Sequence, residues 1–149
     1  MESKEALIEA LGLKQVVRAG WIRAGVEQPE SVAAHSWGMA MLATQLCPEH
    51  LNLQRVLELC ILHDVAEVIV GDITPHDGIA PAEKHRLELE AIQKMGIIAE
   101  DIFAEYEQQD TEESKFVRYL DKLDMALQAE IYEGQGLDLS EFKKALEKW

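Results

Sequence analysis

The sequence lacks the features that mark membrane-spanning and secreted proteins. Its apolar stretches are too short and too often interrupted to cross a bilayer, and no apolar run near the N-terminus resembles a signal peptide. The only two cysteines, Cys47 and Cys60, form neither a C-x-x-C pair nor a zinc-like spacing, which argues against a disulfide framework and favours reduced thiols. These absences predict a soluble protein with no membrane partner in the reducing cytoplasm.

Positive charge is also scarce. Asp and Glu total 28 against 14 Lys and Arg, and the formal net charge is −14. Binding a nucleic-acid polymer relies on many contacts between phosphates and cationic side chains, so this charge balance argues against such a partner. A small phosphorylated ligand stays compatible with the sequence if a metal ion or locally placed cations offset the negative field.

Strict apolar and polar alternation, the mark of half-buried strands, is nearly absent. Runs with a 3.6-residue period dominate instead, and Pro or Gly falls between them, which predicts an all-α fold. A chain of 149 residues that is 48% apolar can bury one core without disulfides, so we expect a single domain over residues 1–149. The expected helices span residues 4–11, 31–47, 53–70, 81–95, 99–106, 111–133 and 138–149.

One predicted helix, apolar on nearly every side, carries three ionisable groups: His63, Asp64 and Glu67. Burying an unpaired charge is costly, so such groups are normally paired, neutralised or bound to a metal. His35 and Asp121 interrupt two other apolar helical patterns. Two imidazoles and two carboxylates suit Mn, Co, Fe, Ni or Zn better than calcium, and water in the remaining positions would make the site open and catalytic.

The pattern H…HD…D, formed by His35, His63, Asp64 and Asp121, resembles the metal motif of the HD-domain phosphohydrolases. The likeness covers most of the chain, from residue 13 to residue 129. The stretches LKQVVRAGW, PESVAAHSW, LHDVAEVIVGDITP, EKHRLELEAI and YLDKLDMALQA resemble signatures of the HD proteins that act as 5′-nucleotidases on deoxynucleoside monophosphates. The resemblance implies a compact HD-domain helical bundle with one divalent metal ion in its core, and Mg is then a further candidate for this ion. It also implies a homodimer.

The resemblance also implies a role for each motif residue. It makes His35, His63, Asp64 and Asp121 the metal ligands and places the catalytic carboxylates Glu67 and Asp72 beside them, and it assigns Arg18 and Trp21 to the substrate pocket. Arg18 would bind the phosphate and Trp21 would lie against the nucleoside. Helical spacing independently supports Glu67, which follows His63 by four residues and Asp64 by three and would share their helix face.

Several residue assignments stay open at this level. Asp124 lies one turn beyond Asp121, and spacing alone does not choose between them; the resemblance favours Asp121 and leaves Asp124 as a supporting acid or a surface charge. Glu67 is also compatible with a structural ion pair, and Asp72 with a simple turn-forming role. Which of these two carboxylates acts as the general base is not fixed by the sequence.

The sequence therefore predicts a divalent-metal-dependent 5′-nucleotidase that converts nucleoside 5′-monophosphates, with deoxy forms favoured by the resemblance, to nucleoside and phosphate. The alternatives are an HD hydrolase of cyclic nucleotides, triphosphates or guanosine alarmones, and a non-catalytic nucleotide sensor. Glu67 and Asp72 argue against the sensor, which would not require them. Leu62 argues against the dinuclear oxidative HD enzymes, which usually carry an additional His beside the His-Asp pair.

Overall fold

The computed structural model describes residues 3–148, and over this range the chain forms helices and no β-strand. The α-helices are α1 (Lys4–Leu11), α2 (Ala19–Arg23), α3 (Val32–Leu46), α4 (Leu53–Leu62), α5 (Glu67–Val70), α6 (Pro81–Lys94), α7 (Glu100–Gln108) and α8 (Glu112–Tyr132). Short 3-10 helices span Gly12–Gln15, Pro75–Asp77, Glu133–Gln135, Ser140–Phe142 and Lys144–Lys148. The predicted all-α class is confirmed. None of the helices described is both long and apolar enough to cross a membrane.

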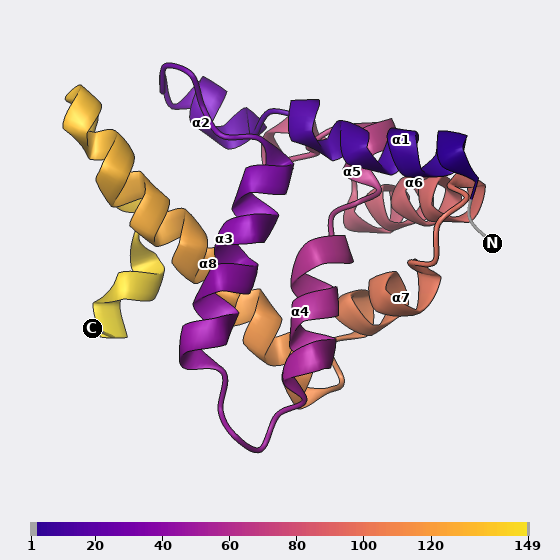
Figure 1. Cartoon of the computed structure of the whole chain (residues 1–149). Coiled ribbons are helices and arrows are strands. Elements are labelled where there is room, and N and C mark those ends of the chain that lie inside the picture. The colour runs from indigo at the N-terminus through magenta and orange to yellow at the C-terminus, as the bar shows by residue number, and fades with distance from the viewer. Residues whose placement is uncertain (1–2, 149) are drawn as a thin grey trace.

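The centre of the molecule is formed by α3, α4 and α8. Helix α3 packs against both of the others, and Figure 1 shows it crossing α8 while α4 runs beside it. Their apolar faces meet in a buried cluster that includes Met39, Val56, Leu59, Leu120 and Leu123. Burial of these aliphatic side chains is the main force that fixes the three helices relative to one another.

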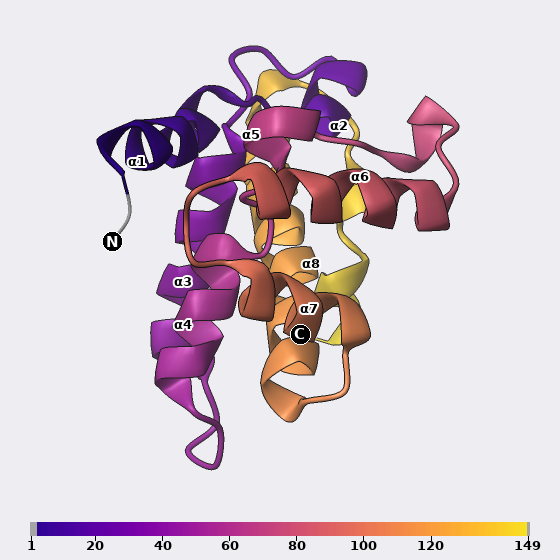
Figure 2. The same cartoon turned by 90° about the vertical axis from the view of Figure 1, so that its right-hand side faces the viewer.

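Two further clusters extend this centre. Helices α5, α6 and α7 meet around a cluster that includes Val65, Ile92 and Phe103, and Figure 2 shows α6 and α7 stacked across one side of the bundle. Trp21 and Leu139 pack with residues near the end of α8, which attaches α2 and the C-terminal segment to that helix. The segments that carry the predicted site residues are therefore all anchored to apolar cores.

Local sequence signals account for several helix ends. The Ser31 hydroxyl accepts a hydrogen bond from the Ala34 amide at the start of α3, and Pro81 is the first residue of α6. The Thr111 hydroxyl accepts from the Ser114 amide at the start of α8. These features confirm the predicted helices near residues 31–47, 81–95 and 111–133 to within a few residues.

The prediction of one continuous helix over residues 53–70 is wrong. Helix α4 ends at Leu62, residues 63–66 form a turn, and α5 begins at Glu67. The tighter turn is visible in the hydrogen bond from the Glu67 amide to the Asp64 carbonyl, three residues back. The His63 side chain contributes to the break. Its Nδ1 atom lies 3.0 Å from the Cys60 carbonyl oxygen, where it competes with backbone amides for that acceptor.

The predicted last helix, residues 138–149, is also wrong for the part that the structure describes. This segment contains two short 3-10 helices, Ser140–Phe142 and Lys144–Lys148, and Trp149 lies outside the described residues. The Asp138 carboxylate accepts hydrogen bonds from both the amide and the hydroxyl of Ser140. This local side-chain turn replaces the helix start that Asp138 would otherwise cap.

Candidate metal centre and adjoining pocket

The turn after α4 places His63 and Asp64 opposite His35 of α3. Each of the three residues has a possible metal-ligating atom within 4.8 Å of the others. Both imidazoles are buried, and their ring centres lie 6.4 Å apart. Two imidazoles and a carboxylate that converge from separate elements form a donor set suited to a divalent transition metal.

The hydrogen bonds of His63 leave one ring nitrogen available. Its Nδ1–H donates to the Leu59 and Cys60 carbonyl oxygens, at 3.1 and 3.0 Å, so the Nε2 atom carries the lone pair in the neutral ring. Nε2 is buried without a hydrogen bond, although it lies 3.0 Å from Oδ2 of Asp64. A buried nitrogen lone pair facing a carboxylate oxygen lacks a positive partner, so these residues fit a shared cation.

His35 lies between two acids of α8. Its Nδ1 atom is 2.6 Å from Oδ2 of Asp124, and its Nε2 atom is 2.5 Å from Oδ1 of Asp121. Burial alone would lower the pKa of His35, but these two carboxylates outweigh it and raise the pKa to about 9. Asp121 and Asp124, which sequence spacing left equivalent, thus contact opposite nitrogens of the same ring.

The contact with Nδ1 places Asp124 where a carboxylate can orient the His35 ring. A carboxylate bound to one imidazole nitrogen fixes the tautomer and leaves the other nitrogen free for a ligand role. Asp121 is the acid on the Nε2 side, although it is not a member of the group of three whose ligating atoms lie within 4.8 Å. The supporting-acid alternative for Asp124 therefore agrees better with its contacts than the surface-charge alternative.

Sequence reasoning missed the contribution of Gly38. A Cβ atom at this position of α3 would lie 2.1 Å from Oδ1 of Asp124. Glycine weakens a helix interior, so its presence there usually has a packing reason. Here it leaves the space that the Asp124 carboxylate occupies beside His35.

Glu67 is buried at the start of α5, and its Oε2 atom has no hydrogen-bond partner. Burial and the neighbouring charges of Asp64 and Asp72 raise the pKa of Glu67 to about 10. Among the described residues no cation forms an ion pair with Glu67, so the structural ion pair considered from the sequence is not observed. Its carboxyl group therefore stays close to the candidate ligands with an atom free to bind water or substrate.

Unlike Glu67, Asp72 forms a hydrogen bond with the protein backbone. Its Oδ2 atom accepts a hydrogen bond of 2.8 Å from the Ala19 amide at the start of α2. This contact attaches the loop after α5 to the segment that carries Arg18. Asp72 thus lies close to Glu67 and Arg18, but part of its hydrogen-bonding capacity holds two chain segments together.

Glu88 is a second carboxyl group that sequence reasoning missed. It lies on the buried face of α6, one turn before Ala91 and Ile92, and its nearest ion-pair contact is 3.9 Å from Nζ of Lys84. Burial raises the pKa of Glu88 to about 7; Lys84 opposes this shift and the charge of Asp64 adds to it. Its place one turn before Ala91 and Ile92, on the same helix face, was the available signal.

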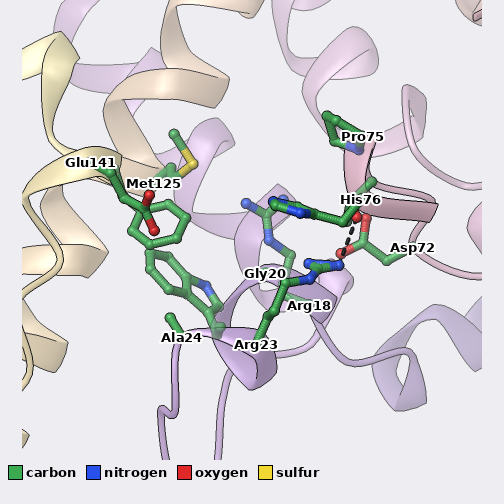
Figure 3. Close-up of a pocket in the computed structure, with 12 residues that line it drawn as sticks. Arg18, Gly20, Arg23, Ala24, Asp72, Pro75, His76, Met125 and Glu141 are labelled. Atoms are coloured by element: carbon green, nitrogen blue, oxygen red, sulfur yellow. Dashed lines mark hydrogen bonds between the residues drawn. The ribbon is translucent and has the colours of Figure 1, made fainter. Parts of the chain in front are cut away.

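A cavity of about 400 Å³ is lined by Arg18, Trp21 and Asp72 among others. The candidate metal ligands and Glu67 are not among its lining residues. Figure 3 shows Asp72, Pro75 and His76 on one side and Met125 and Glu141 on the other, with Arg18 between them. The structure thus brings both predicted substrate residues to the same pocket.

The Trp21 side chain offers little surface to this pocket. The residue is only 2% exposed, and its ring centre lies 5.2 Å from that of Tyr132 and 4.9 Å from that of Phe142. Most of the indole surface is therefore used in internal packing. Only an edge of Trp21 is available to a nucleoside, and Phe142 supplies a further aromatic wall of the cavity.

Comparisons with known proteins agree with the sequence resemblance. Residues 10–148 match the HD domain family. The chain is 45% identical over 129 residues to the 5′-deoxynucleotidase HDDC2 of Mus musculus, and the match covers 81% of this chain and 65% of that protein. It is 42% identical over 146 residues to the 5′-deoxynucleotidase hdd1 of Schizosaccharomyces pombe, covering 87% of this chain and 73% of the relative.

A solved structure shows the same fold. The chain superposes on a conserved hypothetical protein from Pyrococcus furiosus with a TM-score of 0.86 and 33% sequence identity, covering 97% of this chain and 91% of the other. The curated relatives are longer, and the chain spans slightly less than two thirds of the length of the Mus musculus protein.

Proposed function

This chain belongs to the HD domain family, and on that premise we propose that it is a metal-dependent 5′-nucleotidase. The substrates are nucleoside 5′-monophosphates, preferably deoxynucleotides, and the products are nucleoside and inorganic phosphate. The observation that carries the proposal is the buried Nε2 atom of His63, which faces Asp64 and His35 without a hydrogen bond. The names of the Mus musculus and Schizosaccharomyces pombe relatives support the choice of substrate.

We assign one divalent ion to His35, His63, Asp64 and Asp121, drawn from Mn, Co, Ni, Fe or Zn, with Mg as a further possibility. When bound, such an ion polarises a phosphoryl oxygen and lowers the pKa of a coordinated water. Asp124 contacts Nδ1 of His35 and thereby orients the ring toward the ion. The donor set of mixed nitrogen and oxygen atoms supports a transition metal over calcium.

Arg18 binds the substrate phosphate in this mechanism. Its guanidinium lines the cavity, and although burial would lower the pKa of Arg18, surrounding carboxylates raise it, so the side chain stays cationic. A guanidinium can donate two parallel hydrogen bonds to phosphate oxygens, which orients the phosphoryl group for in-line attack. The nucleoside occupies the same cavity, against Phe142 and the edge of Trp21.

Glu67 is the better candidate for the general base, and the contacts of the two carboxylates support this choice. Glu67 has a free Oε2 atom, whereas Asp72 holds the Ala19 amide. Burial and the charge of Asp64 raise the pKa of Glu67, and a divalent ion bound beside Asp64 would offset this charge, so that the Glu67 carboxylate could form. Glu67 then accepts a proton from the attacking water as the new P–O bond forms and the P–O5′ bond breaks, and the departing 5′-oxygen takes a proton from Glu67 or from solvent. Asp72 helps to hold Arg18 and the loop around the reacting groups.

The decisive experiment measures phosphate release from a panel of nucleotides after Mn, Co, Mg, Ni or Zn is added to metal-stripped protein. Fast turnover of deoxynucleoside 5′-monophosphates is the expected result. Cleavage of cyclic nucleotides, triphosphates or alarmones in their place would assign the chain to another class of HD hydrolase. Nucleotide binding with no turnover would support a sensor. A cytoplasmic location, a homodimer and a single domain over residues 1–149 stay predictions.

A further inference from the structure

We propose that Glu30 is a positioning residue that holds Arg18 and Trp21 in place for the substrate phosphate and keeps Arg18 away from the carboxylates of the metal centre. This inference rests on the proposed function, because it assumes that Arg18 binds a phosphate. Glu30 lies in the loop before α3, and neither its spacing nor the HD motif singled it out.

The backbone brings Glu30 and Arg18 side by side. Val17 and Ser31 form an isolated antiparallel bridge, and the Arg18 amide donates a hydrogen bond of 3.1 Å to the Glu30 carbonyl oxygen. This bridge connects the segment before α2 to the start of α3, the helix that carries His35. The proposed phosphate-binding side chain and a proposed metal ligand are therefore fixed to the same backbone contact.

A single carboxylate oxygen of Glu30 faces both pocket residues. Oε2 accepts a hydrogen bond of 2.9 Å from Nε1 of Trp21 and lies 4.0 Å from Nε of Arg18. The Arg18 and Glu30 side chains are 16% and 10% exposed, so solvent screens their attraction only weakly. The Tyr132 hydroxyl accepts from the Glu30 amide at 2.9 Å, which attaches this loop to α8.

The charges around Arg18 explain why this contact matters. Its guanidinium is attracted by four carboxylates: Asp121, Glu30, Asp72 and Asp64. Asp121 and Asp64 are proposed metal ligands, and an arginine drawn onto them would compete with the cation. Of the other two acids, Asp72 already accepts a hydrogen bond from the Ala19 amide, and the mechanism gives Glu30 neither a ligand nor a catalytic role. Its attraction acts at Nε and leaves the two terminal nitrogens of Arg18 for phosphate oxygens.

A second cation site is the main alternative for Glu30, because ligating atoms of Glu30, His35 and Asp124 lie within 4.8 Å of one another. However, two of these possible metal-ligating atoms already take part in contacts within the protein. His35 Nδ1 contacts Asp124 at 2.6 Å, and Glu30 Oε2 accepts from Trp21. These contacts favour a positioning role over a metal-binding role.

The Glu30→Gln variant tests the inference. Glutamine keeps the length of the side chain and an oxygen that can accept from Trp21, but it removes the charge beside Arg18. We expect the KM for a deoxynucleoside monophosphate and the inhibition constant of inorganic phosphate to rise roughly 10-fold, which is the scale of one hydrogen bond to a charged group. In excess metal, the values of kcat and Tm should change little. At limiting metal, the metal content should fall, because Arg18 then competes for Asp64 and Asp121, and it should recover when Arg18→Ala is added. Glu27→Gln is the matched control, because Glu27 is an exposed acid of the same loop.

A double-mutant cycle with Arg18→Ala separates positioning from general damage. If Glu30 acts through Arg18, adding Glu30→Gln to Arg18→Ala should change the phosphate inhibition constant by less than about twofold. Additive effects, or a lower Tm with unchanged phosphate affinity, would overturn the inference. A metal content that falls in Glu30→Gln and stays low when Arg18→Ala is added would favour the cation site.

The two proposals can fail separately. If the wild-type protein hydrolyses no nucleotide, the proposed function is wrong, and calorimetric titration of inorganic phosphate into metal-loaded protein still measures the effect of Glu30. Wild-type protein that binds no phosphate in that titration would overturn the role given to Glu30.

Discussion

Glu67 is a buried carboxyl group to which we assign the role of proton acceptor. Its carboxyl group is buried without an ion-pair partner among the described residues, so replacing it should not cost the stability that loss of a salt bridge would. Glu67→Gln keeps the shape but cannot accept a proton. We expect kcat to fall by roughly 10²-fold or more, with metal content, nucleotide affinity and Tm nearly unchanged. Near-normal kcat in this variant would contradict the catalytic assignment.

The raised pKa of Glu88 predicts that the free energy of unfolding depends on pH. Its pKa is about 7 in the folded protein, above the ordinary value of 4.5, so the folded state binds the proton more tightly than the unfolded state. The stability contributed by protonated Glu88 is present below about pH 4.5 and is lost as the pH rises through about 7. Urea unfolding from pH 4.5 to 8 should show Glu88→Gln gaining on the wild type as the pH rises, by on the order of 1 kcal/mol. A difference independent of pH would contradict this prediction.

At the scale of helices, Gly38 links the packing of α3 and α8 to the metal centre. Gly38→Ala places a Cβ atom where the Asp124 carboxylate lies, so Asp124 must move and lose its contact with His35. Loss of such a supporting group typically lowers metal affinity about 10- to 100-fold. We expect Gly38→Ala and Asp124→Ala to weaken metal binding to a similar degree in titrations with Mn or Zn.

Gly134→Ala is the control for that substitution, because a Cβ atom at Gly134 meets nothing within 4 Å. It should leave metal affinity unchanged. Unchanged metal affinity in Gly38→Ala would mean that Asp124 does not orient His35.

The helices also show where sequence reasoning works and where it stops. Helix α3 was predictable because an apolar run follows the Ser31 cap and ends before Pro48. The break between α4 and α5 was not, because it involves the His63 ring binding carbonyls of its own helix and the tight turn that follows. Periodicity reports which face is apolar; it does not report a side chain that competes for backbone hydrogen bonds.

At the scale of the whole molecule, the candidate ligands could be identified from the sequence while their partners could not. The chemistry of His35, His63, Asp64 and Asp121 is visible as ionisable residues in apolar helices. The different contacts of Asp121 and Asp124, and the attachment of Arg18 to Glu30, depend on how distant segments approach one another. Such long-range pairings leave no periodic signal in one sequence, so they became visible only in the folded chain.

Metal removal should therefore destabilise the whole fold, because the candidate ligands join α3, the turn after α4, and α8 at the centre of the bundle. An ion that binds only the folded state at about 100 times its Kd adds about 2.7 kcal/mol of stability. For a chain of 149 residues that corresponds to a rise in Tm of roughly 5–10 °C over the metal-stripped protein. Scanning calorimetry should show this rise on adding Mn or Zn to the wild type. His63→Ala should show almost none, since it lacks the Nε2 atom that has no hydrogen-bond partner in the wild-type chain. A full metal-dependent rise in His63→Ala would place the ion elsewhere in the molecule.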